Sequence, residues 1–192
     1  SGDLAGQGWG INEDIGGYRI FDAMAQLDPD FFLCSGDNIY ADGPIQATAT
    51  LPDGRVYRSL TTEEKSRVAV SLADFRGGNF RYNLLDAALR RFNARVPNII
   101  QWDDHEVRNN WYPPGEVIGA GTPYPAGTKL DDLALRARRA FSEYFPISTI
   151  SGRPDGRIYR VHHHGPLLDV FVLDMRTYRD ANSPDDQKSD PQ

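Results

Sequence analysis

The sequence has a single cysteine, Cys34, among its 192 residues. One thiol cannot form an intramolecular disulfide, and it excludes a zinc cluster built from several cysteines. No apolar run approaches the roughly 20 residues that a membrane-spanning helix needs. Basic residues are also few, since 21 Lys and Arg against 27 Asp and Glu give 21 − 27 = −6. This balance argues against a generic nucleic-acid backbone binder and suits the binding of hard cations by carboxylates.

Two common catalytic signatures are absent as well. No Gly-x-Ser-x-Gly sequence occurs, so an α/β-hydrolase nucleophile is not supported, and no Gly-Lys-Ser or Gly-Lys-Thr follows a glycine-rich loop, so there is no P-loop. The run His162, His163, His164 looks like a metal site, but neighbours on a strand point to opposite faces, and at most two can converge. We favour a partly exposed edge strand over metal ligation for this run.

What the chain does contain is an alternation of helical periodicity and short apolar runs. The expected helices cover residues 18–27, 85–92 and 130–144; the expected strands cover 31–34, 98–102 and 167–173; a hairpin is expected from 157 to 163, turning at 165–166. In the first helix, Ile20, Met24 and Leu27 share one helical face. The alternation predicts an α/β fold.

Two segments interrupt this alternation. Residues 41–64 contain a predicted β-hairpin with a turn at Pro52-Asp53-Gly54, and residues 112–128 are rich in Gly and Pro and lack helical period. We interpret both as loop excursions over the active edge of the sheet, where loops shape substrate access. Residues 1–192 as a whole are expected to form one catalytic domain.

Each apolar run is followed by one or two acidic residues: Asp37 after the first, Asp103 and Asp104 after the second, and Asp174 after the third. In open α/β sheets the ligand site lies outside the carboxyl ends of the strands, so these carboxylates are expected at one edge, as a metal site. The alternative is that Asp is common after strands because it begins turns and caps helices. For any single aspartate we favour the turn or cap interpretation. For all of them together, with His105 beside one, we favour the metal site.

The most specific stretch is residues 102–111, WDDHEVRNNW. Asp104 can ligate a metal, His105 can protonate a leaving oxygen or stabilise charge, and Glu106 can orient the imidazole. Asp103 with Glu106 three residues later also fits a capping box at a helix N-terminus. The two interpretations are compatible, because capping leaves His105 without a role.

Asp37 follows Gly36, which lets the backbone turn sharply after the strand, and a carboxylate there can bridge two cations. Tyr40 lies close enough in sequence to turn its phenol to the same point, and a phenolate favours a hard trivalent ion such as iron. The alternative for Tyr40 is a core aromatic with a satisfied hydroxyl. Asp3 stands at the same edge if a strand precedes it, against the alternative of a frayed terminus.

These motifs carry a family resemblance. The stretches SGDLAGQGWG, PDFFLCSGDNIYADGP, FRGGNFRYNLLDAALRRFNARVPNIIQWDDHEVRNNWYP and LDMRTYR resemble PhoD-type alkaline phosphatases and phosphodiesterases, within the calcineurin-like metallophosphoesterase superfamily. They span almost the whole chain in the family's order. WDDHEVRNNW is highly specific, GDNIY moderately so, and LDMRTYR is supporting.

The resemblance implies a two-metal phosphoester hydrolase on a metallophosphoesterase-type αββα sandwich, of which this chain holds the N-terminal part. It implies Fe3+ with Ca2+, or other divalent metals, and attack on phosphomonoesters or phosphodiesters by a metal-bound hydroxide. The positions that match its metal ligands are Asp3, Asp37, Tyr40 and Asp104. Those assigned to catalysis are Asp37 and His105, and those assigned to substrate binding are Arg108 and Asn109.

The implied partners are small-molecule phosphate esters, with no specific nucleic acid. The family's late Gly-Asp-x-His-type ligands follow the last residue given, so a C-terminal segment or a second chain is expected to complete the site. The implied location is secreted or periplasmic. The competing hypotheses are a non-catalytic, carboxylate-rich calcium-binding domain of the same fold and a nuclease of the same superfamily. The second is less favoured because the sequence lacks a basic groove interleaved with aromatics.

Overall fold

The computed structural model describes residues 2–4, 8–147 and 157–182. Its helices are η1 (Glu13–Ile15), α1 (Ile20–Ala25), the π-helical η2 (Asp74–Phe80), α2 (Arg81–Asn83), α3 (Ala87–Asn93) and α4 (Leu130–Tyr144). Its strands are β1 (Phe32–Cys34), β2 (Thr48–Thr50), β3 (Val56–Arg58), β4 (Asn98–Ile100), β5 (Val117–Ile118), β6 (Thr128–Lys129), β7 (Arg160–His164) and β8 (Leu168–Val172).

The described strands associate only in pairs. β1 and β4 are parallel, in a register that places Cys34 opposite Ile100, and β2–β3, β5–β6 and β7–β8 are antiparallel hairpins. The parallel pair is the consequence of a long crossover that carries the chain through η2, α2 and α3 before β4. The fold is therefore mixed α/β, as the sequence predicts.

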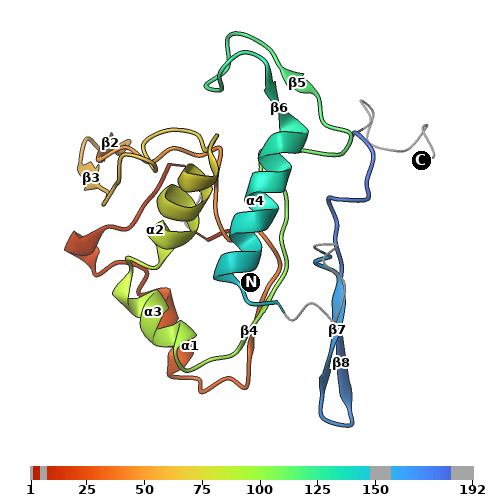
Figure 1. Ribbon diagram of the computed structural model, residues 1–192. Helices are drawn as coiled ribbons and strands as arrows, with labels where there is room; N and C mark the ends of the chain where they lie inside the picture. Colours follow the sequence, from red (N-terminus) through yellow and green to blue (C-terminus); the bar gives the residue numbers. More distant parts are fainter. Residues whose placement is uncertain (1, 5–7, 148–156, 183–192) are drawn as a thin grey trace.

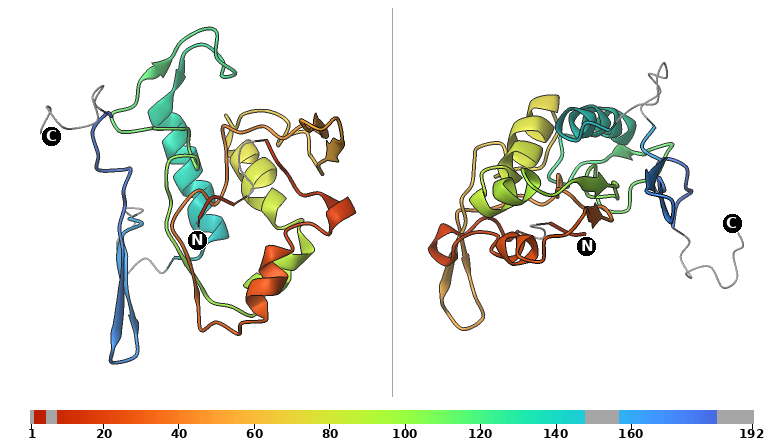
Figure 2. Two further views of the ribbon diagram at one scale, coloured as in Figure 1. Left: turned by 180° about the vertical axis from the view of Figure 1, so that it is seen from behind. Right: turned by 90° about the horizontal axis from the view of Figure 1, so that it is seen from below.

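The main hydrophobic core lies between the parallel strands and the helices. Figures 1 and 2 show α2 and α4 on the same side of the β1–β4 pair. In α4 the side chains of Leu133, Ala137 and Phe141 are fully buried and recur every fourth residue, which places them on one helical face. Phe141 packs against Trp102, with ring centroids 6.0 Å apart. The helix predicted over 130–144 is confirmed, with these bounds.

Of the helical face that Ile20, Met24 and Leu27 share, only Met24 packs against the core. Ile20 and Leu27 are 61% and 79% exposed, whereas Phe21 is 5% exposed. Phe21 packs against Phe92 of α3 and Phe32 of β1, with ring centroids 5.4 and 6.4 Å apart. An aromatic ring buries more apolar area than an aliphatic side chain, so the short α1 is oriented by Phe21 rather than by the aliphatic residues.

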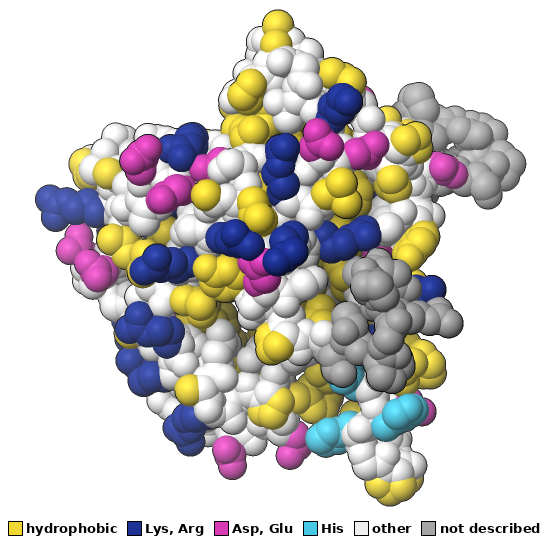
Figure 3. Space-filling model, in the orientation of Figure 1, with side chains coloured by type: hydrophobic (Ala, Val, Ile, Leu, Met, Phe, Trp, Pro, Cys, Tyr) yellow, Lys and Arg dark blue, Asp and Glu magenta, His cyan; other side chains and the backbone are white. Residues whose placement is uncertain are grey.

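The predicted hairpins are confirmed. The turn between β2 and β3 closes through a hydrogen bond from Leu51 N to Arg55 O, with Gly54 at φ 83°. In the β7–β8 hairpin the histidine run is mostly exposed, as Figure 3 shows, and His163 Nδ1 lies 2.7 Å from Asp169 Oδ1. Among helices in the described ranges, none combines the length and apolarity needed to cross a membrane.

Candidate metal centre

Two loops leave the same end of the parallel pair. One follows β1 and carries Asp37; the other follows β4 and carries Asp104 and His105. The pairing continues one step past the strands, because Gln101 N donates to Cys34 O at 3.0 Å. Both loops therefore begin side by side, which is the placement expected from parallel strands.

The loops pass so closely that one position must be glycine. Gly36 has φ 114°, and a Cβ there would lie 2.5 Å from the Cβ of Asp103 and 3.0 Å from its backbone nitrogen. Asp37 follows in the left-handed region, at φ 47°, which Asp tolerates better than most residues. The predicted sharp turn after the strand is confirmed.

Three donors meet where the loops cross. Asp37, Asp104 and His105 each present one ligand atom, and these atoms lie within 4.8 Å of one another. Both carboxylates are buried and the imidazole is partly buried. Carboxylate oxygens with an imidazole nitrogen form a donor set that several di- and trivalent cations accept.

The carboxylates of this group repel one another. Burial raises the pKa of Asp37 to about 6, with the nearby charge of Asp104 acting in the same direction and His105 opposing it. A raised carboxyl pKa means that the ionised form is disfavoured in the absence of a cation. A positive charge placed between Asp37 and Asp104 would relieve this.

The partner of His105 is Asp42, a residue that the sequence analysis missed. His105 Nδ1 lies 2.7 Å from Asp42 Oδ1, and Asp42 Oδ2 accepts a hydrogen bond of 2.7 Å from Asn109 N. Burial lowers the pKa of His105, but the hydrogen bond and charge of Asp42, together with Asp104 and Asp37, outweigh it, so this pKa lies above its ordinary value. The imidazole is oriented by Asp42, and the prediction that Glu106 orients it is wrong.

Glu106 contacts the backbone instead. Its Oε2 accepts from Asp103 N at 2.7 Å, which is the Glu half of the predicted capping box, although the segment forms turns and no helix. Its Oε1 accepts from Asn38 N at 2.5 Å. Burial raises the pKa of Glu106 to about 7 against the effect of these donors.

Tyr40 lies over the imidazole. Its ring stacks on that of His105 with centroids 4.4 Å apart, and its hydroxyl lies near the Asp37 carboxyl group. Burial, followed by the charge of Asp37, raises the pKa of Tyr40 above its usual range. Tyr40 therefore reaches the group as a neutral phenol, and the predicted phenolate requires a cation to form.

The other predicted residues border the group. Asp3 N donates to Gly36 O at 3.2 Å, which places Asp3 beside the first loop, but its side chain is exposed and is not one of the three donors. Arg108 pairs with Glu116 at 2.9 Å. Asn109 is exposed and is held through its backbone. Their roles in ligation or substrate binding stay predictions.

A family model described as PhoD-like phosphatase matches residues 3–192. The chain belongs to the PhoD-like phosphatase family. It is 29% identical over 181 residues to alkaline phosphatase D of Bacillus subtilis (strain 168), a match that covers 92% of this chain and 28% of that protein. It is similar to a solved structure described as PhoD, at 30% identity and a TM-score of 0.61, covering 88% of this chain and 30% of that one. The chain thus spans less than a third of the length of these relatives, and the resemblance seen in its motifs is confirmed.

In this PhoD-like chain Asp174 lies outside the donor group, so the prediction that three strand ends meet at one edge is wrong. β8 pairs with β7 and does not join the β1–β4 pair. Asp174 Oδ1 accepts from Trp102 Nε1 at 2.9 Å and from Thr177 N at 2.9 Å. Close by, Arg176 bonds Asp103 through Nε and lies 3.4 Å from Asp104 Oδ2. The LDMRTYR motif therefore stabilises the loop after β4 through its contacts with Trp102, Asp103 and Asp104.

Replacing Asp174 by alanine is expected to lower stability and leave metal content unchanged. The indole N–H of Trp102, which is fully buried, would lose its acceptor, at a cost of about 1–3 kcal/mol. Denaturant unfolding measures the first effect and elemental analysis the second. Loss of metal with unchanged stability would return Asp174 to the ligand set.

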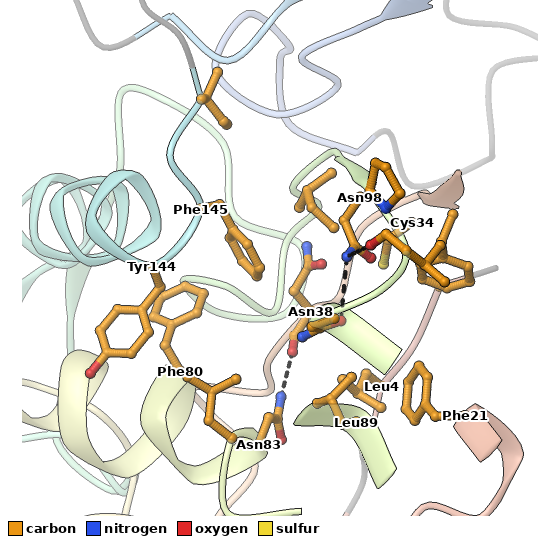
Figure 4. Close-up of a pocket in the computed structure, with 18 of the residues that line it drawn as sticks. Leu4, Phe21, Cys34, Asn38, Phe80, Asn83, Leu89, Asn98, Tyr144 and Phe145 are labelled. Atoms are coloured by element: carbon orange, nitrogen blue, oxygen red, sulfur yellow. Dashed lines mark hydrogen bonds between the residues drawn. The ribbon is translucent and has the colours of Figure 1, made fainter. Parts of the chain in front are cut away.

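A separate cavity of about 670 Å³ lies between the helices and the β1–β4 pair. Its lining is mainly apolar, with Phe21, Leu89 and Phe145 pointing into it, and Asn83 Nδ2 donates to Asn38 O at its edge (Figure 4). None of the three donors is among its lining residues in the described part of the chain. The cavity therefore does not include the three donors, although Asp3 is among the residues that line it.

Proposed function

We propose that the protein hydrolyses phosphomonoesters or phosphodiesters in a metal-dependent reaction, and that this chain supplies part of the active site. The observation that carries the proposal is the meeting of Asp37, Asp104 and His105 at the ends of two parallel strands, in a chain of the PhoD-like phosphatase family. Phosphoester hydrolysis needs charge neutralisation at the phosphate and a proton for the leaving oxygen, and carboxylates holding cations beside an imidazole can provide both.

The residues present fit a bound cation. In the part of the chain that the structure describes, Asp37 forms no ion pair with Lys or Arg, although it is buried beside Asp104. We propose Fe3+ and Ca2+, or other divalent metals, held by Asp37 and Asp104, with Tyr40 and Asp3 as further ligands. Metal ions, when bound, neutralise phosphate oxygens and lower the pKa of water, which provides the nucleophile.

The chain's own residues would position the phosphate and protonate the leaving oxygen. The Asp42 carboxylate keeps a proton on Nδ1 of His105, so that Nε2 is directed to the leaving oxygen, and the raised pKa of His105 favours the protonated form that can donate there. Asn109 and Arg108 are proposed to contact the phosphate, and the backbone of Asn109 is fixed by Asp42.

We propose that the remaining ligands come from a further part of the protein or from a second chain, and that the whole forms an αββα sandwich. This agrees with the fraction of the relatives that the chain spans. An exported location is part of the same proposal, and fractionation of the producing cells tests it.

Metal removal tests the proposed function. The dialysed intact protein is expected to contain metal in near-integer ratio to protein and to hydrolyse p-nitrophenyl phosphate or its diester. Chelation should abolish turnover, and adding back metals one at a time should restore it. Asp53→Asn, on the exposed β2–β3 turn, is a suitable control and should behave as the parent protein. Metal binding without turnover would favour the calcium-binding alternative, and protein without metal would contradict both.

A further inference from the structure

Glu106 is 0% exposed and accepts hydrogen bonds from both loops of the metal centre. Oε1 accepts from Asn38 N at 2.5 Å and from Asn38 Nδ2 at 2.9 Å, and Oε2 accepts from Asp103 N at 2.7 Å. Asn38 directly follows Asp37, and Asp103 directly precedes Asp104. One carboxylate thus spans the backbone positions next to the two carboxylates that meet in the donor group.

The first of these loops is tied to other elements through Asn38. Asn38 Nδ2 also donates to Gln101 O at 2.7 Å, and Asn38 O accepts from Asn83 Nδ2 of α2 at 2.7 Å. The backbone N–H, the carbonyl and the side-chain NH2 group of Asn38 are therefore engaged in a buried network centred on Glu106. Such a network fixes geometry only when every member has its partner.

We propose that Glu106 is a positioning residue, whose two carboxyl oxygens clamp the two loops at the spacing that lets Asp37 and Asp104 share a cation. Only the shared cation rests on the proposed function, because the clamp itself consists of hydrogen bonds. Three N–H donors face Glu106, two at Oε1 and one at Oε2. Both oxygens of the side chain must therefore accept hydrogen bonds.

This requirement makes Glu106→Gln a sharp test. Glutamine has the same shape but only one acceptor oxygen, so its NH2 group must face an N–H of the protein. Keeping the oxygen at Asn38 preserves two hydrogen bonds, whereas keeping it at Asp103 preserves one. We therefore expect the amide of Asp103 to lose its acceptor while that of Asn38 keeps its own.

The chain offers a matched control at Asp86. This buried carboxylate also accepts a backbone N–H on each oxygen, from Leu89 at 2.7 Å and from Tyr18 at 2.8 Å, but it caps α3 away from the metal centre. Asp86→Asn creates the same conflict between two donors. It should lower stability to a similar degree and leave the metal centre unchanged, which separates positioning from a general loss of stability.

The experiment compares the intact parent protein with both variants by amide hydrogen exchange and by calcium titration after chelation. In Glu106→Gln we expect faster exchange over residues 103–105 and calcium affinity weaker by about 10–100-fold, the usual cost of altering a residue that supports a metal ligand. Asp86→Asn should show faster exchange at the start of α3 and the calcium affinity of the parent.

Unchanged exchange over residues 103–105 in Glu106→Gln would overturn the clamp. Altered exchange with unchanged calcium affinity would overturn its positioning role. If the parent protein binds no calcium, the proposed function loses support while exchange still decides the clamp. Should Glu106→Gln fail to fold, Glu106→Asp keeps both carboxyl oxygens but is one methylene too short to reach both loops, and it is expected to show the same two effects.

Discussion

Replacing Asp37 by alanine is expected to abolish metal retention and hydrolysis together. Asp37 is the buried carboxylate of the first loop and lies within 4.8 Å of the donor atoms of Asp104 and His105. Altering a residue that merely supports a metal ligand costs about 10–100-fold, so removing a ligand should lower turnover of p-nitrophenyl phosphate by more than about 100-fold. Elemental analysis of the dialysed variant should show the metal missing.

Asp37→Asn separates the effect of losing the charge from the effect of straining the backbone. Asp37 adopts φ 47°, a conformation that Asn tolerates and Ala does not favour, so the amide variant removes the charge with little strain. We expect it to lose metal as the alanine variant does. Because burial disfavours the ionised Asp37 carboxylate and Asn tolerates this backbone, the loss in Asp37→Asn should not come from unfolding, and thermal unfolding of metal-free protein checks this. Full activity with bound metal in Asp37→Asn would contradict the proposed site.

The strand ends explain why the donors of this site could be predicted. Asp37 and Asp104 each follow a short apolar run that local periodicity identifies as a buried strand, and parallel pairing brings such ends to one edge. The same reasoning failed for Asp174, because alternation along β8 does not specify its partner strand. β8 pairs with β7 through a turn of a few residues, and local closure competes with any longer-range pairing.

Supporting residues were harder to find than ligands. Asp42 contacts His105 across 63 positions of sequence, and no local pattern distinguishes it from an ordinary loop aspartate before Gly43 and Pro44. For Glu106 the predicted capping contact with Asp103 is confirmed, whereas the prediction that it orients His105 is wrong. Sequence spacing fits the capping bond to Asp103, whereas the bond to Asn38 depends on how closely Gly36 lets the loops approach.

Asp42 and His105 are expected to act as one unit in protonating the leaving group. General acid catalysis contributes about 10²–10⁴-fold, so His105→Ala should lower kcat by that order for esters of poor leaving groups and by less for p-nitrophenyl esters. Asp42→Asn offers one acceptor where the carboxylate serves both His105 Nδ1 and Asn109 N, and it should show the same dependence on leaving group. Because the two residues share one task, the double variant should be little worse than His105→Ala.

A second His–Asp pair in the chain provides the control for this comparison of single and double variants. His163 Nδ1 lies 2.7 Å from Asp169 Oδ1, the same distance as in the pair at the metal centre, but the pair is exposed on the β7–β8 hairpin. Asp169→Asn should therefore leave kcat unchanged for every leaving group. If Asp42→Asn and His105→Ala multiplied in the double variant, or if their effects were equal for good and poor leaving groups, the two residues would not be acting together as the acid. His105 would then serve only as a metal ligand, with Asp42 holding the loop through Asn109.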